Sequence, residues 1–241
     1  MENTGDYKQL SNQPIDYFTS TIKGILGGAP YIGSLLAELA GIVIPNQRLD
    51  RIASFVEKLD KKVANLEKDY LMSQLNDEYF SDLLEEGLHH VVRSITGERR
   101  DYIANLISNS LSLQDIQYIE SKHLLRILGE LNDIEIIWLN YHQRISRGRD
   151  TKFYEKHKDI LKPILASSAD QQSAYNKAAI QNNYKEHLSQ LGLLEPSYET
   201  DIMTEVLIFD KFTGRRRVSH YDLTSLGRLF LQQIGLAPPN K

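Results

Sequence analysis

The chain has 241 residues, of which 41% are hydrophobic and 25% are charged, with 28 Lys and Arg against 32 Asp and Glu. This composition is typical of a globular protein with one or two domains. The absence of cysteine excludes disulfides, thiolate nucleophiles and cysteine-ligated zinc or iron–sulfur sites. The net charge of −4 argues against a chain that coats nucleic acid without sequence preference.

The two ends of the chain have polar or proline-containing sequences. Residues 1–13 are polar and aperiodic, and residues 237–241 contain two consecutive prolines, so we expect flexible tails at both places. The first 20 residues lack the pattern of a secretory signal, and no run of about 18 uninterrupted apolar residues is present. We therefore expect a cytoplasmic protein.

Residues 24–44 are the most hydrophobic stretch, and Glu38 is their only charged side chain. Glycines and a proline divide the stretch into two short arms, which predicts a helical hairpin. Each arm is too short to span about 30 Å of hydrocarbon. Burial in a helical bundle is the favoured interpretation, and contact with a second copy or a membrane surface is the alternative. The side chains expected to make that contact are Ile32, Leu35, Leu36 and Leu39.

Residues 49–70 have an apolar residue at alternating spacings of three and four, which predicts one long helix with a heptad seam. About three heptads are short for a free coiled coil, so packing inside a bundle is favoured over an oligomer. The alternative, an oligomer contact, would use Leu49, Ile52, Val56, Leu59, Val63 and Leu66.

Three further helices are predicted at 78–95, 98–111 and 113–131, the last with a break near Ser121 left open. Short links join them, as in an antiparallel bundle. The sequence thus predicts a helical domain over residues 14–131.

A second domain is predicted over residues 132–236. Asn132 resembles a helix N-cap, and Asp133 and Glu135 follow in the first turn, where the helix dipole favours negative charge. Helices are then expected to about Tyr141, at 153–165 and at 168–191, followed by strands at 203–209 and 216–221 and a helix capped by Thr224. The fold class is therefore mainly α, with an α+β second domain that contains a β-hairpin.

Two motifs give this second domain a resemblance to bacterial winged helix-turn-helix domains. Residues 188–194 read L-S-Q-L-G-L-L, and residues 223–230 read L-T-S-L-G-R-L-F. The resemblance implies that the third helix enters the DNA major groove and that the hairpin, or wing, contacts phosphate. The residues that would contact nucleic acid are Lys177, Gln181, Lys185, Lys211, Arg215, Arg216 and Arg217.

Charge gives only mild support to DNA binding. Residues 132–241 have 15 basic and 13 acidic side chains, a balance of +2, whereas residues 1–131 have 13 basic and 19 acidic ones, a balance of −6. A dedicated DNA-binding domain usually has a more basic face. Because winged helices also serve as protein-docking modules, that role is favoured over DNA binding.

The runs at residues 103–111 and 124–133 are similar to the core of the bacterial abortive-infection alpha family. The resemblance covers about residues 78–140 and rests on the helical pattern. It implies a non-catalytic role in phage defence and assigns no functional residue.

Patterns for catalysis or metal binding are weak. Glu86 and His89 have a spacing used by di-iron bundles, but the helical pattern places them away from the apolar face, and Glu120 and His123 have the same spacing. The glycines at 24–28 lack a P-loop ending, and no G-x-S-x-G motif occurs. We therefore predict no catalytic residue, metal or cofactor, and a non-enzymatic protein that binds a partner or its own copies. The alternatives are a DNA-binding regulator and a membrane-perturbing effector that uses residues 24–44.

Overall fold

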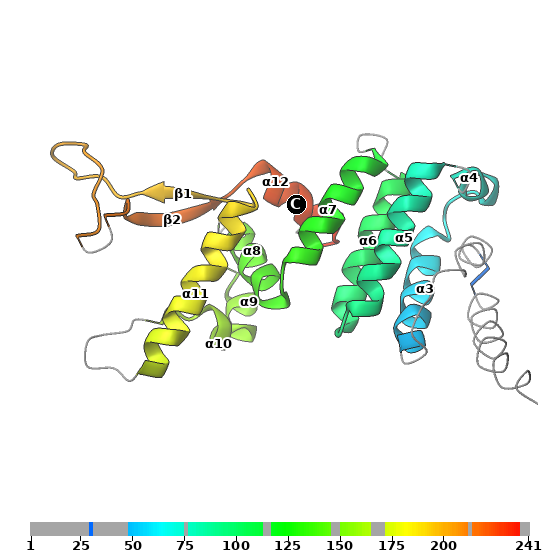
Figure 1. The fold of residues 1–241 in the computed structure, drawn as a ribbon, viewed down its shortest axis with the longest axis horizontal. Coiled ribbons are helices and arrows are strands. Elements are labelled where there is room, and N and C mark those ends of the chain that lie inside the picture. Colours follow the sequence, from blue (N-terminus) through cyan, green and yellow to red (C-terminus); the bar gives the residue numbers. More distant parts are fainter. Residues whose placement is uncertain are drawn as a thin grey trace, which may run out of the picture. The chain divides into compact units, whose positions relative to one another are not determined.

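The computed structural model describes most of the chain (Figure 1), namely residues 29–30, 48–74, 77–112, 117–145, 150–164, 172–211 and 214–236. The predicted tails and the helical hairpin at 24–44, with Ile32, Leu35, Leu36 and Leu39, lie outside the described residues, except for Ala29 and Pro30. The described part is mainly helical, with one two-stranded antiparallel sheet. None of its helices is both long enough and apolar enough to cross a membrane.

The chain divides into two compact units, residues 1–126 and 127–241. We call them the N-terminal unit and the C-terminal unit. The division lies inside helix α7 (Tyr118–Glu130), whereas the sequence pattern placed a boundary at 131, just after this helix. Helix α7 is continuous at Ser121, where a break had been left open.

The N-terminal unit contains α3 (Leu49–Val63), α4 (Lys68–Gln74), α5 (Glu78–Arg93), α6 (Gly97–Ser112) and the start of α7. The predicted helices at 78–95 and 98–111 are confirmed as α5 and α6. Helix α5 begins where Asp77 accepts hydrogen bonds from the backbone N–H groups of Tyr79 and Phe80. This N-cap satisfies donors that lack partners within the helix.

The core of the N-terminal unit forms where α3 packs against α5 and α6. Four residues of the heptad seam are buried there, together with Phe55; they are Ile52, Val56, Leu59 and Val63. Leu49 and Leu66 are half-buried. The seam is thus used inside the chain, and its central residues are not exposed on the surface of this unit.

The prediction of one helix from 49 to 70 is wrong at its C-terminal end. Helix α3 ends at Val63, a turn follows, and α4 begins at Lys68. In α4, the Tyr70 hydroxyl donates to the backbone carbonyl of Leu111 at the end of α6, and Leu71 is buried. A straight continuation of α3 would follow the local heptad pattern, but these tertiary contacts favour the turn instead.

The C-terminal unit contains α8 (Asp133–Ile145), α9 (Thr151–Lys156), α10 (Lys158–Leu161), α11 (Gln172–Gln190), β1 (Leu194–Tyr198), β2 (Val218–Leu223) and α12 (Ser225–Gln233). Helix α8 packs against α11, β2 and α12. The Asn132 N-cap is confirmed, because its side-chain oxygen accepts from the backbone N–H of Glu135 at 2.9 Å. The Glu135 carboxylate accepts from the backbone N–H of Asn132 in return, at 2.8 Å, which completes a capping box.

The two strands pair antiparallel, from Leu194 opposite Leu223 to Tyr198 opposite Val218. The prediction of a first strand at 203–209 is wrong, because that segment contributes only isolated bridges at Leu207 and Phe209. The second predicted strand, at 216–221, overlaps β2. The apolar residues near 203 alternate with polar ones but are exposed, so their pattern does not mark a buried sheet face.

The closing helix is confirmed. The Thr224 hydroxyl accepts from the backbone N–H of Gly227 at 2.9 Å and donates to the Gly192 carbonyl. Gly192 follows α11 at a φ of +73°, a conformation that glycine adopts without steric cost. These two residues position the start of β1 beside the start of α12.

Candidate functional site

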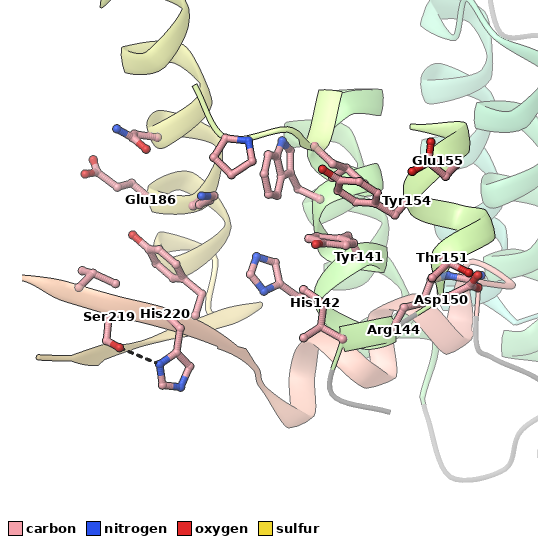
Figure 2. Close-up of a pocket in the computed structure, with 18 residues that line it drawn as sticks. Tyr141, His142, Arg144, Asp150, Thr151, Tyr154, Glu155, Glu186, Ser219 and His220 are labelled. Atoms are coloured by element: carbon pink, nitrogen blue, oxygen red, sulfur yellow. Dashed lines mark hydrogen bonds and ion pairs between the residues drawn. The ribbon is translucent and has the colours of Figure 1, made fainter. Parts of the chain in front are cut away.

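A cavity of about 790 Å³ lies within the C-terminal unit, between α8, α9, α10, α11 and β2 (Figure 2). Its α8 wall is largely aromatic because Trp138, Tyr141 and His142 recur at helical spacing and face the same side, followed by the aliphatic Ile145. Two aromatic contacts join this wall to other elements. The rings of Tyr141 and Tyr154 lie 5.9 Å apart between centroids, and those of His142 and Tyr221 lie 6.3 Å apart.

Lys185 of α11 brings a positive charge into this aromatic wall. Its Nζ lies 4.7 Å from the centroid of the Trp138 ring, within cation–π range. Burial lowers the pKa of Lys185. Among the residues that the structure describes, no carboxylate lies within ion-pair distance of this ammonium group.

The carboxylates around the cavity are paired with other cations. Asp150 accepts a hydrogen bond from Arg144 and caps α9 through the backbone N–H of Phe153. Glu155 lies 3.4 Å from the Lys158 ammonium group on the same stretch of chain. On α11, Glu186 lies 4.0 Å from the guanidinium of Arg215. The charge of Lys185 is thus the uncompensated one in the described part of the cavity wall.

Two residues of the α8 wall each have a buried polar atom without a hydrogen-bond partner in the described structure, namely Trp138 at Nε1 and His142 at Nε2. Burial, followed by the positive charge of Lys185, lowers the pKa of His142 to about 4, although a backbone hydrogen bond with Tyr221 opposes this shift. The imidazole is therefore neutral near pH 7. A buried polar atom without a partner costs about 1–3 kcal/mol, so a bonding partner at either atom would be stabilising.

Glu135 and His187 form a buried link between α8 and α11. Glu135 is nearly inaccessible, and its second carboxylate oxygen lies 2.7 Å from His187 Nδ1. Since the first oxygen is used in the capping box with Asn132, the carboxylate is fully engaged inside the protein. This pair fixes one wall of the cavity and is not free to contact a ligand.

The segment between β1 and β2 extends the hairpin away from the helices of the C-terminal unit (Figure 1). We call residues 200–207 the hairpin tip. Asp201 Oδ1 accepts from the backbone N–H groups of Met203 and Thr204, both at 2.9 Å, and these bonds lower the pKa of Asp201. A further bond joins the Asp201 N–H to the Val206 carbonyl. The tip is therefore a defined turn.

The hairpin tip presents apolar side chains to solvent. Ile202 is 96% exposed and Met203 is 92% exposed, and Val206 and, just after the tip, Phe209 are also exposed. Burial would be favourable for each of these side chains, and the turn made by Asp201 holds the first two outward.

The residues predicted to contact nucleic acid are dispersed. Gln181 is buried, donates to the carbonyls of Ile160 and Lys162, and accepts from the N–H of Ile164. Its amide is therefore occupied within the unit, which contradicts a base-reading role. Lys185 lies in the cavity wall, whereas Lys177 is exposed on α11.

The three arginines of the hairpin are exposed, but they have partners on the hairpin or beside it. Arg217 lies 3.4 Å from Glu199, and the guanidinium of Arg216 lies 5.4 Å from the centroid of the Tyr198 ring. Arg215 is paired with Glu186, as described above. Lys211, in the segment between β1 and β2, is also exposed. These cations remain accessible, yet they do not form an unpaired basic face.

The histidines considered as metal ligands pair differently from the predicted spacing. His89 lies 3.9 Å from Glu85, and His90 lies 3.4 Å from Glu86, one helical turn away in each case. The described residues contain no group of three or more His, Asp or Glu side chains placed to hold a metal ion.

Sequence reasoning found only part of the cavity. It predicted the helix that reaches Tyr141 and selected Lys185 as a nucleic-acid contact, but it did not connect Lys185 with Trp138 or with the other residues of the α8 wall. The aromatic spacing along α8 was a usable signal, whereas the approach of α11 and β2 was not visible in the sequence. In comparisons with models of known protein families, with curated proteins and with solved structures, no match was found.

Proposed function

We propose that the protein acts by binding and not by catalysis, and that its C-terminal unit docks a partner protein through the hairpin tip. The observation that carries this proposal is the exposure of Ile202 and Met203 on a turn that Asp201 holds in one conformation. Adjacent apolar side chains that are both exposed and pre-positioned favour association, because little conformational freedom is lost on binding.

The charge of the hairpin supports a protein partner over a phosphate backbone. Residues 194–223 contain six acidic and four basic side chains, a balance of −2. Arg215 and Arg217 are already close to carboxylates, and those contacts would have to be exchanged for contacts with phosphate. DNA binding gains its affinity from cations that neutralise phosphates.

Co-purification from cells of the native host tests the proposal. A tagged wild-type chain should retain a protein partner that the double variant Ile202→Asp with Met203→Asp loses. The matched control is Asn183→Asp with Gln232→Glu, which adds the same two charges at exposed helix positions of the same unit. Equal retention by both double variants would contradict docking through the tip. Retention of the chain's own untagged copies would identify a homo-oligomer as the partner.

DNA binding is the second candidate, and the exposure of Lys177, Lys211 and the hairpin arginines favours it. The order of α8 to α11, hairpin and α12 also agrees with a winged helix-turn-helix. An electrophoretic shift that weakens steeply with salt, and that is lost when Arg215, Arg216 and Arg217 are changed to Ala, would support this role. No shift on any duplex at low salt would exclude it.

The biological setting that we propose, phage defence, rests on the resemblance of residues 103–111 and 124–133 to the abortive-infection alpha family. A phage challenge of host cells tests it. The wild-type chain should lower the plaque count, and the hairpin-tip double variant should not. For the membrane alternative, which depends on residues 24–44, the test is co-flotation with anionic liposomes and its loss in Leu36→Glu.

A further inference from the structure

The cavity of the C-terminal unit has features that docking through the hairpin tip does not use. We propose that this cavity is a binding site for a small planar aromatic anion. The described part of the cavity wall has one uncompensated cation, two buried polar atoms without partners, and aromatic surfaces.

Lys185 determines which charge a ligand of the cavity should have. Its ammonium group faces the Trp138 ring at 4.7 Å, and the carboxylates of the cavity wall are held by Arg144, Lys158 and Arg215. Lys185 is half-buried, and a partly desolvated ammonium group without a counter-ion is unfavourable, so an anion beside it would be stabilised. In the described part of the cavity, Lys185 is therefore placed to select a negative charge.

Two side chains of α8 determine which hydrogen-bonding groups a ligand should have. Trp138 is buried, and its indole N–H is a donor without a partner among the described residues. His142 Nε2 is likewise buried and unpartnered, on the same helix one turn later. Both atoms are almost inaccessible in the fold, so a ligand would reach them by displacing neighbouring side chains. A ligand with oxygen or nitrogen atoms at the edge of a ring would then bond to them, whereas an aliphatic ligand would leave them unsatisfied.

The aromatic walls and the volume of the cavity determine which shape a ligand should have. Tyr141, Tyr154 and Tyr221 add aromatic surfaces to those of Trp138 and His142, so a flat ring can stack against more than one of them. About 790 Å³ lies within the range of known small-molecule sites. A mononucleotide and an aromatic carboxylate share the required chemistry, namely a ring with polar edges and a negative charge.

Isothermal titration calorimetry of the full chain tests the proposal with two probes, adenosine monophosphate and 4-hydroxybenzoate. We expect at least one of them to bind, and acetate and benzamide to bind at least tenfold more weakly, because the former lacks the ring and the latter the charge. Trp138 is the only tryptophan in the chain, so its fluorescence should change on binding and report the location of the site.

Matched variants connect the binding to the proposed residues. Lys185→Met keeps the aliphatic stem and should weaken binding at least tenfold, whereas Lys156→Met, at an exposed position of α9 outside the cavity lining, should leave it unchanged. Trp138→Phe keeps a ring and removes the N–H, and it should also weaken binding. Circular dichroism should confirm that each variant is folded, and if Lys185→Met does not fold, the Trp138→Phe titration decides.

Each outcome of these titrations either supports the proposed anion site or overturns it. Binding of the nucleotide alone or of the carboxylate alone supports the proposal and identifies the source of the anion. Binding that Lys185→Met and Trp138→Phe leave unchanged would overturn it, because the anion would then bind elsewhere. The absence of binding by both probes at millimolar concentration would also overturn it and indicate a cavity that holds only water.

Discussion

The interiors of the two units are built from different side chains. In the described part of the N-terminal unit, the buried polar residues are all serines, and three of them donate to a carbonyl of their own helix; these three are Ser94, Ser108 and Ser110. The C-terminal unit instead buries longer polar side chains, namely Glu135, Asn140, Gln143, Gln181 and Gln233.

The buried polar side chains of the two units therefore have different structural roles. A serine that bonds within its own helix makes no demand on neighbouring elements, so the buried contacts among α3, α5 and α6 are apolar. The polar contacts among these helices, such as Arg51 to the Val92 carbonyl and Lys62 to Asp101, are only partly buried. Glu135 and Gln181 bond across elements, and each therefore fixes where α11 lies relative to α8 or to the end of α10. Such networks specify geometry, and they surround the cavity in which Trp138 and His142 have unpartnered atoms.

The largest effect is expected in the apolar interior of the N-terminal unit. Phe55 is 0% exposed, so Phe55→Ala should lower the free energy of unfolding by about 3–5 kcal/mol through lost burial and the cavity left behind. Chemical denaturation followed by circular dichroism measures it. As a control, Ile95→Ala, at a position 84% exposed, should change the free energy by less than about 0.5 kcal/mol. A small effect of Phe55→Ala would contradict a close-packed core.

The C-terminal unit should depend on pH through His142. Its folded pKa of about 4 lies below the unfolded value of about 6.5. As pH falls between these values, the unfolded chain binds a proton that the folded chain does not. The free energy of unfolding should therefore decrease, by an amount on the order of 3 kcal/mol from this group.

The comparison of variants isolates this contribution. Urea unfolding at pH 7 and pH 4, followed by the fluorescence of Trp138, should show a smaller pH dependence in His142→Phe than in the wild-type chain. His123→Gln, at an exposed position of the N-terminal unit, should keep the wild-type dependence. Identical slopes in all three proteins would mean that His142 is not buried in its neutral form.

The contact between the start of β1 and the start of α12 should tolerate little added side-chain volume at Gly227. A Cβ at Gly227 would lie 2.3 Å from the Leu193 carbonyl oxygen and 2.8 Å from Leu223 Cδ1. Because one of these atoms is backbone, Gly227→Ala should cost about 1–3 kcal/mol in the free energy of unfolding, again measured by denaturation. Ser225→Ala, exposed on the same helix, is the control and should have a small effect. A neutral Gly227→Ala would show that α12 can shift freely.

The smallest effect on stability is expected at the hairpin tip. Ile202→Asp with Met203→Asp should change the free energy of unfolding by less than about 0.5 kcal/mol, since neither side chain is packed in the fold. A thermal melt measures it. Strong destabilisation would mean that the tip has a structural role, and loss of partner binding by this variant would then not identify a docking surface.

The sequence predicted those parts of the fold that depend on local signals. The periodicity of α5 and α6, the N-cap at Asn132 and the Thr224 cap all act within a few residues, and each is confirmed. The end of α3 was wrong because tertiary contacts of α4, not a local stop signal, set it. Strand β1 was missed because Pro196 disfavours strand prediction, and here it occupies a two-stranded sheet in which β1 is an edge.

The candidate site was less predictable because its residues come from distant segments. Trp138 and His142 share a helix, but Lys185 and Tyr221 approach only in the folded unit. Gln181 illustrates the opposite error, since a polar residue on a predicted surface helix proved to be buried and bonded. Periodicity indicates which face of a helix is apolar, and it does not reveal which polar side chains find partners in other elements.

The claim that binding is located at the hairpin tip is tested most directly by photo-crosslinking in host cells. A photoreactive amino acid is placed at position 203 in one chain and at position 95 in another, since Met203 and Ile95 are exposed apolar residues of the two different units. We predict a discrete protein adduct from position 203 and none from position 95. An adduct from position 95 alone, or a nuclease-sensitive adduct from position 203, would contradict protein docking through the tip.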